Sequence, residues 1–239
     1  MKAILGINAY HADSAACLII DGKLIAAAEE ERFSRIKHWA GFPTKSIIYC
    51  LQKGKISLRD VKYVAVNSDP TAKRLEKIKY VLSHRPDFKM LWDSFHKKRH
   101  RRGIAEVLQT SLNMPFHGEV HSVEHHLAHL ASAHWASPFD ESAVVSIDGF
   151  GDFSSGAFGV GNEFELNILE SVNFPHSLGI YYQALTQFLG FSNYGDEYKV
   201  MGLAPYGEPK FLSELRQIVQ QKSEGRYELN LSFFLHHRK

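Results

Sequence analysis

A histidine pair and a following acidic turn are the residues of this 239-residue chain best suited to chemistry. His125 and His129 are four residues apart in a segment with helical periodicity that ends near Trp135. Residues at this spacing lie on one face of a helix, with Cβ atoms about 5–6 Å apart. Asp148 follows a short apolar strand at 143–147 and opens the sequence DGFGD. Two imidazoles and a carboxylate form a nitrogen/oxygen ligand set suited to iron, zinc or manganese, so the pattern predicts a divalent metal site.

The alternative interpretation is that both histidines are packed or solvated and bind no metal, because most helical histidines bind no ion. Asp148 favours the metal interpretation, since a strand-end acid that is followed by glycines is more often functional than structural. His126 falls on another face of the helix, and His134 lies more than two turns beyond His125. Both of these neighbours are therefore predicted to be structural.

A polar loop near the N-terminus is the second candidate for chemistry. The surrounding pattern predicts three strands, with an Asp-Gly turn between the second and the third, at 3–8, 15–20 and 23–28. The loop after the first strand carries His11, Asp13 and Ser14, which could surround a nucleotide phosphate. An ordinary polar loop is the competing interpretation, because many hairpins have the same pattern.

The rest of the chain predicts a mixed α/β fold. A helix at 43–51 and a strand at 61–67 complete the order β-β-β-α-β. Residues 71–111 predict helices that are broken around Arg85-Pro86, and a strand at 116–123 leads into the histidine helix. In the second half, the sequence predicts a hairpin of strands 156–161 and 164–172. Helices at 178–189 and 208–222 and a final strand at 226–234 follow.

Two charged segments are each open to two interpretations. Residues 29–38 (EEERFSRIKH) are typical of a solvated strand end that turns into a loop, although Arg32, Arg35 and Lys37 could instead contact an anionic ligand. Residues 96–102 (HKKRHRR) form the strongest charge run, which is typical of a solvated helix face. A footprint for RNA or another polyanion is the alternative. A nucleic-acid partner is disfavoured, because no aromatic-and-glycine RNA-binding signature accompanies the run.

Composition places the chain among ordinary soluble globular proteins. Hydrophobic residues make up 44% of it, charged residues 23%, and the formal net charge is only +2. Cys17 and Cys50 both lie in apolar segments and predict no disulfide, which favours a reducing cytoplasm. Because no segment approaches the roughly 18–20 apolar residues that span a bilayer, no membrane partner is predicted.

Three segments taken together resemble the carbamoyltransferases of the NodU/CmcH type. They are GINAYHADSAACLIIDG near the start, HHLAHLASAHW with VSIDGFGD in the middle, and GDEYKVMGLAPYG near the end. The similarity extends over essentially the whole chain, and the family is related in fold to the tRNA threonylcarbamoyladenosine synthases. The resemblance implies an α/β lobe of the actin/sugar-kinase/heat-shock (ribonuclease-H-like) superfamily, with a mixed sheet and flanking helices.

The activity that this resemblance implies is transfer of a carbamoyl group to a hydroxyl of a small-molecule acceptor. A YrdC-like domain of such enzymes makes carbamoyl-adenylate from carbamoyl phosphate and ATP. The implied metal, with iron preferred over zinc or manganese, matches His125, His129 and Asp148, and a fourth aspartate ligand belongs to the second lobe. His11 and Lys37 are the predicted catalytic residues, with His11 as general base. The predicted phosphate-binding residues are Asp13, Ser14, Gly149, Gly151 and Lys199.

Length is the main departure from the family pattern. Members are about twice as long or more, so residues 1–239 are predicted to be one N-terminal domain, an incomplete first lobe without the second lobe and the YrdC-like domain. The chain is expected to be a truncated form, or to depend on a separate chain for the C-terminal half, and to expose apolar surface. Two rivals remain: a phosphotransferase of the same superfamily, which needs no histidine pair, and a polyanion-binding module at 96–102.

Overall fold

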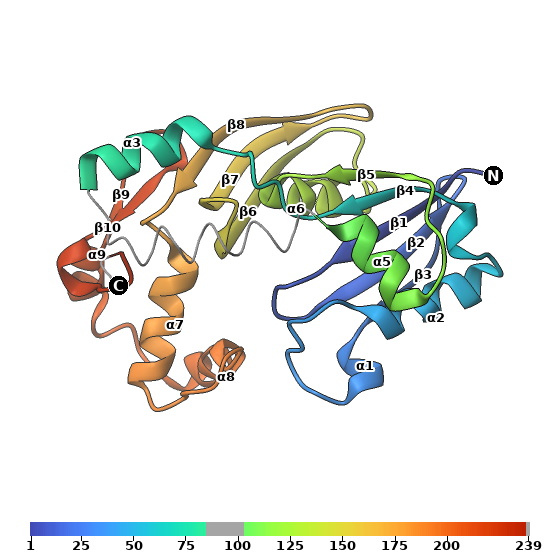
Figure 1. The fold of residues 1–239 in the computed structure, drawn as a ribbon. Coiled ribbons are helices and arrows are strands. Elements are labelled where there is room, and N and C mark those ends of the chain that lie inside the picture. The colour runs from blue at the N-terminus through green and yellow to red at the C-terminus, as the bar shows by residue number, and fades with distance from the viewer. Residues whose placement is uncertain (85–102, 238–239) are drawn as a thin grey trace. The chain divides into compact units, whose positions relative to one another are not determined.

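The computed structural model describes residues 1–84 and 103–237, which form two compact units (Figure 1). Unit 1 contains the described residues of 1–70 and 103–123, and unit 2 contains those of 71–84 and 124–237. The charge run at 96–102 and the break around Arg85-Pro86 lie outside the described residues. Each unit is presented by itself.

Unit 1 is built on a five-stranded mixed sheet with the order β3-β2-β1-β4-β5. Its strands are β1 (Ala3–Asn8), β2 (Ala15–Ile20), β3 (Lys23–Glu29), β4 (Val61–Val66) and β5 (Glu119–Ser122). The first three pair antiparallel, whereas β4 runs parallel to β1 and to β5. Its helices are α1 (Glu31–Ser34), α2 (Thr44–Gly54), the 3₁₀ turn η1 (Leu58–Asp60) and α5 (Ile104–Leu112).

The core of unit 1 lies between one face of this sheet and two helices. Alternation along β1 buries Ala3, Leu5 and Ile7. Helices α2 and α5 cover that face and contribute Ile47 and Leu108, which are fully buried (Figure 1). Each buried aliphatic side chain of this size stabilises the fold by roughly 1.5–3 kcal/mol. This packing holds the loops at the strand ends in place.

Unit 2 contains an antiparallel sheet with the order β6-β7-β8 and a smaller pair, β9 with β10. Its strands are β6 (Ser142–Gly151), β7 (Ser154–Gly161), β8 (Leu166–Asn173), β9 (Val219–Gln221) and β10 (Tyr227–Leu229). Its α-helices are α3 (Arg74–His84), α6 (His125–His134), α7 (Leu178–Phe188), α8 (Glu197–Leu203) and α9 (Leu212–Ile218). Its 3₁₀ turns are η2 (Ala204–Tyr206), η3 (Ser223–Gly225) and η4 (Leu231–Phe233).

Helix α6 packs on one face of the β6-β7-β8 sheet. Leu130 from the helix contacts Val144 and Ala157 from the strands, and all three are buried. On the opposite side of β6, Val145 and Ile147 are 58% and 53% exposed. The histidine helix is therefore anchored to the strand that carries Asp148.

The predicted α/β class with a mixed sheet and flanking helices is confirmed. The order β-β-β-α-β and the strand order of unit 1 are those of a ribonuclease-H-like lobe. Several boundaries were wrong, among them those of β6, of α9 and of the predicted final strand 226–234, in which only Tyr227–Leu229 forms a strand. The segment 148–151 belongs to β6, and the turn follows it at 152–153, because β6 pairs again with β7 between Gly151 and Ser154. The predicted helix at 208–222 ends at Ile218, since β9 begins there and pairs with β10.

Glu30 corrects the prediction of a solvated charged segment. Its side chain is buried, with the residue only 4% exposed. The carboxylate accepts hydrogen bonds from the backbone N–H of Lys45 (3.1 Å) and of Ser46 (2.8 Å) and from the Ser46 hydroxyl (2.9 Å). The first N–H groups of a helix lack partners within it and favour negative charge. Glu30 therefore caps α2 from a distant point in the sequence.

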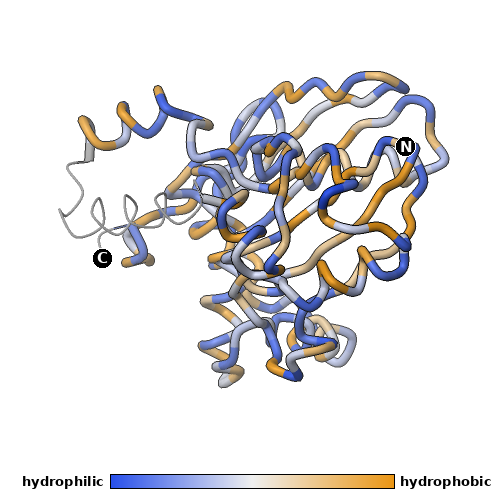
Figure 2. The backbone as a smooth tube through the Cα atoms, turned by 45° about the vertical axis from the view of Figure 1, so that its right-hand side comes forward, coloured by the Kyte–Doolittle hydropathy of each residue, from blue (hydrophilic) through white to orange (hydrophobic). Residues whose placement is uncertain are grey.

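Apolar segments of the chain are short. Hydrophobic and hydrophilic stretches alternate along the backbone (Figure 2). Among the described helices, none has the length and apolar character that a membrane-crossing helix needs. Cys17 and Cys50 are both free thiols, as predicted, and burial raises the pKa of Cys50 to about 11.

Candidate metal centre

Helix α6 begins at the first histidine of the pair, and two carboxylates fix its first turn. Glu124, at the N-cap, accepts a hydrogen bond from the backbone N–H of Leu127 at 2.7 Å. The Asp152 carboxylate accepts one from the backbone N–H of His125 at 3.0 Å. These contacts satisfy N–H groups that have no partner within the helix. The position of His125 is thereby tied to the turn between β6 and β7.

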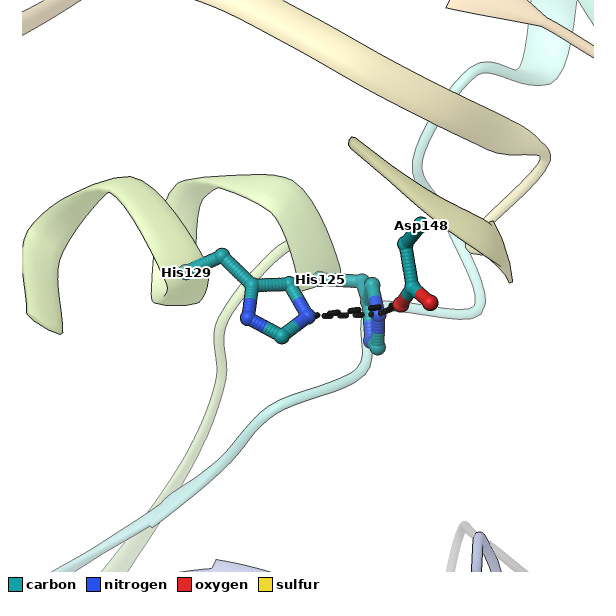
Figure 3. Close-up of side chains that lie close together, drawn as sticks. All are labelled: His125, His129 and Asp148. Atoms are coloured by element: carbon teal, nitrogen blue, oxygen red, sulfur yellow. Dashed lines mark hydrogen bonds and ion pairs between the residues drawn. The ribbon is translucent and has the colours of Figure 1, made fainter. Parts of the chain in front are cut away.

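Three ligand atoms converge at the start of this helix (Figure 3). His125 Nε2 lies 2.9 Å from Asp148 Oδ2 and 3.1 Å from His129 Nε2. His129 Nε2 lies 3.4 Å from the same carboxylate oxygen. The structure therefore brings together the three residues that the sequence predicted as metal ligands.

A tetrahedral ion fits these separations. Metal–nitrogen and metal–oxygen bonds of about 2.1 Å place neighbouring ligand atoms about 3.4 Å apart. The three observed separations of 2.9, 3.1 and 3.4 Å need adjustments of at most about half an ångström to match this value. The donor set of two imidazoles and one carboxylate suits iron, zinc or manganese. The residues present therefore fit a divalent transition metal.

Glycine and serine residues set the close approach of strand, helix and loop. A Cβ on Gly151 would overlap the His125 imidazole, so this position requires glycine. A Cβ on Gly179 would lie 2.6 Å from the Asp148 carbonyl oxygen. The Ser177 hydroxyl lies within hydrogen-bond distance of the carbonyl oxygens of Asp148 (3.0 Å) and Gly149 (2.8 Å). The start of helix α7 therefore packs against the backbone of Asp148 and Gly149 and fixes this part of β6.

The site is closed at one ligand and open at the others. The His125 side chain is only 8% exposed, whereas those of His129 and Asp148 are 50% and 42% exposed. Hydrogen bonds from His125, then from His129, and from the Gly149 N–H hold the pKa of Asp148 well below its usual range. Asp148 is therefore an anion at neutral pH, and the open side leaves room for a further ligand.

The two other histidines of α6 are structural, as predicted. His126 is 1% exposed and its Nδ1 lies 2.9 Å from the Ser146 hydroxyl, and burial lowers its pKa. His134 has contacts at both ring nitrogens, to the Ser142 hydroxyl and to the Asn162 carbonyl oxygen, each at 2.8 Å. Both rings fasten α6 to the sheet.

The remaining predicted residues of unit 2 lie on β6 and α8. Gly149 has open space where a side chain would be, with no atom within 4 Å. Lys199 forms an ion pair with the buried Asp196 at 2.7 Å, and its ammonium lies 5.7 Å from the centre of the Phe191 ring. Phosphate binding by Lys199, Gly149 and Gly151 stays a prediction.

The predicted residues of unit 1 lie in two loops. His11 and Asp13 are half-buried, Lys37 is exposed, and Ser14 is fully buried. The Ser14 hydroxyl lies within hydrogen-bond distance of the carbonyl oxygens of His11 (3.0 Å) and Gly41 (2.7 Å). Asp13 Oδ1 is 2.8 Å from His38 Nδ1. These four residues also stay predictions as catalytic and phosphate-binding groups.

Several residues that shape the site were missed by sequence reasoning. Glu124 and Ser177 are helix N-caps, and a polar residue before a helical segment was the available signal. Asp152 was noticed only as part of DGFGD, and its contact with the His125 N–H depends on the hairpin turn. No local pattern indicated Gly179, because its role depends on packing against Asp148.

The chain is a member of the carbamoyltransferase family. Residues 3–238 match the family model described as Carbamoyltransferase N-terminus, which confirms the resemblance. An uncharacterized protein from Synechocystis sp. is 38% identical over 98% of this chain, and the Nodulation protein NolNO from Sinorhizobium fredii is 36% identical over 94% of it. The chain spans 40% and 32% of the lengths of these two relatives.

Solved structures show weaker likeness. YeaZ from Pseudomonas aeruginosa is 15% identical with a TM-score of 0.39, covering 73% of this chain and 68% of that one. A Ppx/GppA phosphatase from Aquifex aeolicus is 13% identical with a TM-score of 0.35, covering 87% of this chain and 65% of that one. Scores of this size establish no shared fold, so the fold class rests on the strand order described above.

Proposed function

We propose that this chain is the metal-binding part of an O-carbamoyltransferase that acts on a hydroxyl of a small-molecule acceptor. One observation carries the proposal: in a member of the carbamoyltransferase family, His125, His129 and Asp148 aim three ligand atoms at one point. A phosphotransferase of the same fold needs phosphate contacts but no such triad. The geometry therefore favours carbamoyl transfer over the phosphotransferase alternative.

The proposed donor is carbamoyl-adenylate, formed from carbamoyl phosphate and ATP. The acceptor oxygen attacks the carbamoyl carbon and forms a new C–O bond. The bond between that carbon and the adenylate oxygen breaks, AMP departs with its electron pair, and the hydroxyl proton passes to a general base. His11 is the proposed base, because an imidazole can accept a proton near neutral pH.

The triad residues have separate tasks in this proposal. Burial fixes the His125 ring, Asp148 supplies negative charge at neutral pH, and the half-exposed His129 closes the ligand set toward solvent. A dication held there, with iron preferred, supplies Lewis-acid polarisation of a phosphate or carbonyl oxygen. The remaining predicted residues are proposed to line or neutralise phosphate: Asp13, Ser14, Lys37, Gly149, Gly151 and Lys199.

Other parts of the reaction are assigned to the regions of the relatives that this chain does not match. The chain spans less than half of the Synechocystis and Sinorhizobium proteins. We propose that the formation of carbamoyl-adenylate and the fourth metal ligand belong to that remainder. A separate chain could supply it, in which case this chain by itself is expected to bind metal and donor but not to turn the donor over.

Metal-dependent binding of a stable donor analogue tests the proposal. The probe is 5′-O-(N-carbamoylsulfamoyl)adenosine, which keeps the carbamoyl group and replaces the carbamoyl–phosphate anhydride of the donor with a stable acyl sulfamate. Calorimetry would compare the iron- or zinc-loaded chain, the metal-stripped chain and the His125→Ala/His129→Ala variant. We expect elemental analysis to show metal in the parent alone, and analogue affinity to fall at least on the order of tenfold without it.

His121→Asn is the matched control, since this exposed histidine lies on β5 in unit 1. It should retain both metal and analogue binding. Equal analogue binding by the parent and the double variant would contradict the proposal. Turnover of ATP to ADP that survives loss of both histidines would support the phosphotransferase alternative.

A further inference from the structure

A second group of potential metal ligands lies in unit 1. Asp13, Glu31 and His38 each offer one ligand atom, and these atoms all lie within 4.8 Å of one another. His38 Nδ1 is 2.8 Å from Asp13 Oδ1, and the Glu31 carboxylate accepts the backbone N–H of His38 at 3.0 Å. All three residues are half-buried. The group lies in a different unit from His125, His129 and Asp148.

Buried contacts hold the segments that carry these three residues. Ser14 is 0% exposed, its N–H donates to the Trp39 carbonyl oxygen at 2.9 Å, and its hydroxyl lies 2.7 Å from the Gly41 carbonyl oxygen. These bonds join the loop of Asp13 to the loop that follows His38. The segment with Glu31 is fixed by its neighbour Glu30, whose buried carboxylate caps α2. The three ligands are therefore positioned by the fold.

Charge around the group favours a bound cation. Two carboxylates lie close together, which raises the free energy of the folded chain unless positive charge offsets it. Within residues 1–84 and 103–237, no lysine or arginine forms an ion pair with Asp13 or Glu31, and the nearby Arg32 pairs with Glu29 at 3.2 Å. A single imidazole supplies at most one positive charge, and only when protonated.

We propose that Asp13, Glu31 and His38 form a second metal site, which takes a transition-metal dication such as Zn²⁺ or Mn²⁺. An imidazole nitrogen with two carboxylate oxygens is a ligand set for these ions, whereas Mg²⁺ and Ca²⁺ prefer oxygen ligands alone. Three protein ligands leave at least one coordination position for water or a substrate oxygen. Binding displaces any proton from His38 Nδ1 and replaces the direct contact with Asp13. The inference does not depend on carbamoyl transfer.

Metal counting in a background without the first site tests this proposal. The His125→Ala/His129→Ala chain would be stripped of metal, dialysed against Zn²⁺ or Mn²⁺ near neutral pH, and analysed for metal per chain. We expect one equivalent to remain bound. Adding His38→Asn or Asp13→Asn should remove that equivalent, and asparagine tolerates the left-handed backbone of both positions, with φ of 55° and 61°. Glu31→Gln should weaken binding on the order of tenfold.

His121→Asn again provides a matched control, since His121 lies 3.5 Å from Glu119 on an exposed strand without a third ligand nearby in the described chain. It should leave the bound equivalent unchanged, and circular dichroism should show each variant to be folded. The proposal is overturned if the double-alanine chain holds no metal, or if its metal survives His38→Asn. Equal retention of Mg²⁺ would also overturn it, because an acidic surface would then explain the binding.

Discussion

The two groups of metal-ligating side chains are carried by different kinds of backbone. In unit 2, His125 and His129 lie one turn apart on a regular helix, and Asp148 lies on a paired strand. In unit 1, Asp13 and His38 occupy loops with left-handed backbone, and Glu31 begins the single-turn helix α1. A helix sets the spacing of its residues by itself, whereas loops depend on the contacts that join them.

This difference predicts different vulnerabilities. The unit 2 site depends on how closely β6 approaches α6, so added volume between these elements should damage it most. The unit 1 site depends on hydrogen bonds that fasten its segments, so loss of a buried acceptor should damage it most. Each prediction below compares a residue that carries such a contact with a neighbour of the same type that does not.

Gly151→Ala should give the largest effect. The new methyl group would overlap the His125 ring and displace Nε2 from the triad. Forcing added atoms into a packed site costs about 1–3 kcal/mol, and the misplaced ligand should lower metal affinity on the order of 100-fold. Equilibrium dialysis of the purified variant against Zn²⁺ would measure this loss.

Gly149→Ala is the control for that substitution, since no atom lies within 4 Å of its added Cβ. Its metal affinity should stay within about threefold of the parent, because neither His125 nor Asp148 needs to move. Equal losses in the two variants would show that the backbone conformation of β6, and not its distance from α6, controls the site.

Glu30→Gln should give the next largest effect. Both carboxylate oxygens accept N–H groups at the start of α2, and the amide would place an NH₂ group against one of them. Loss of a buried charged acceptor costs about 2 kcal/mol, which corresponds to a fall in Tm of about 4–8 °C for a chain of this size. Thermal unfolding followed by circular dichroism measures this shift.

Glu29→Gln is its control, because Glu29 pairs at 3.2 Å with an Arg32 side chain that is 69% exposed. A surface pair of this kind contributes at most about 1 kcal/mol, so its Tm should change by no more than about 4 °C. If Glu30→Gln is equally mild, Glu30 does not anchor the segment that carries Glu31.

Local patterns predicted the strands of unit 1 and the histidine helix well. Alternating apolar residues predicted β1 and β2. The spacing of His125 and His129 predicted that both histidines belong to the triad, but not the distances between the ligand atoms. The boundary of β6 was wrong because pairing with β7 resumes at Gly151, which is a property of two strands together. The end of α9 was wrong for the same reason, since β9 competes for the residues after Ile218.

Contacts between distant segments account for what the sequence could not reveal in the sites. Asp13 was predicted to face phosphate, but its pairing with His38 spans 25 residues and follows no periodicity. Glu30 was counted as solvated, because helix capping is recognised from adjacent residues and α2 begins at Thr44. Sequence spacing can predict metal ligands that share one helix. Ligands that lie on several loops are recognised only once the folded structure is known.

Glu124→Ala should give the smallest of these effects and separates helix stability from ligand geometry. The Glu124 carboxylate accepts the Leu127 N–H at 2.7 Å, so its loss should cost about 1 kcal/mol of stability. Glu119→Ala removes an exposed carboxylate on β5 and should cost about half of that or less. Because packing of Leu130 also holds α6 in place, metal affinity of the Glu124 variant should fall less than tenfold. A fall as large as that of Gly151→Ala would mean that the first turn of α6, and not the approach of β6, positions the triad.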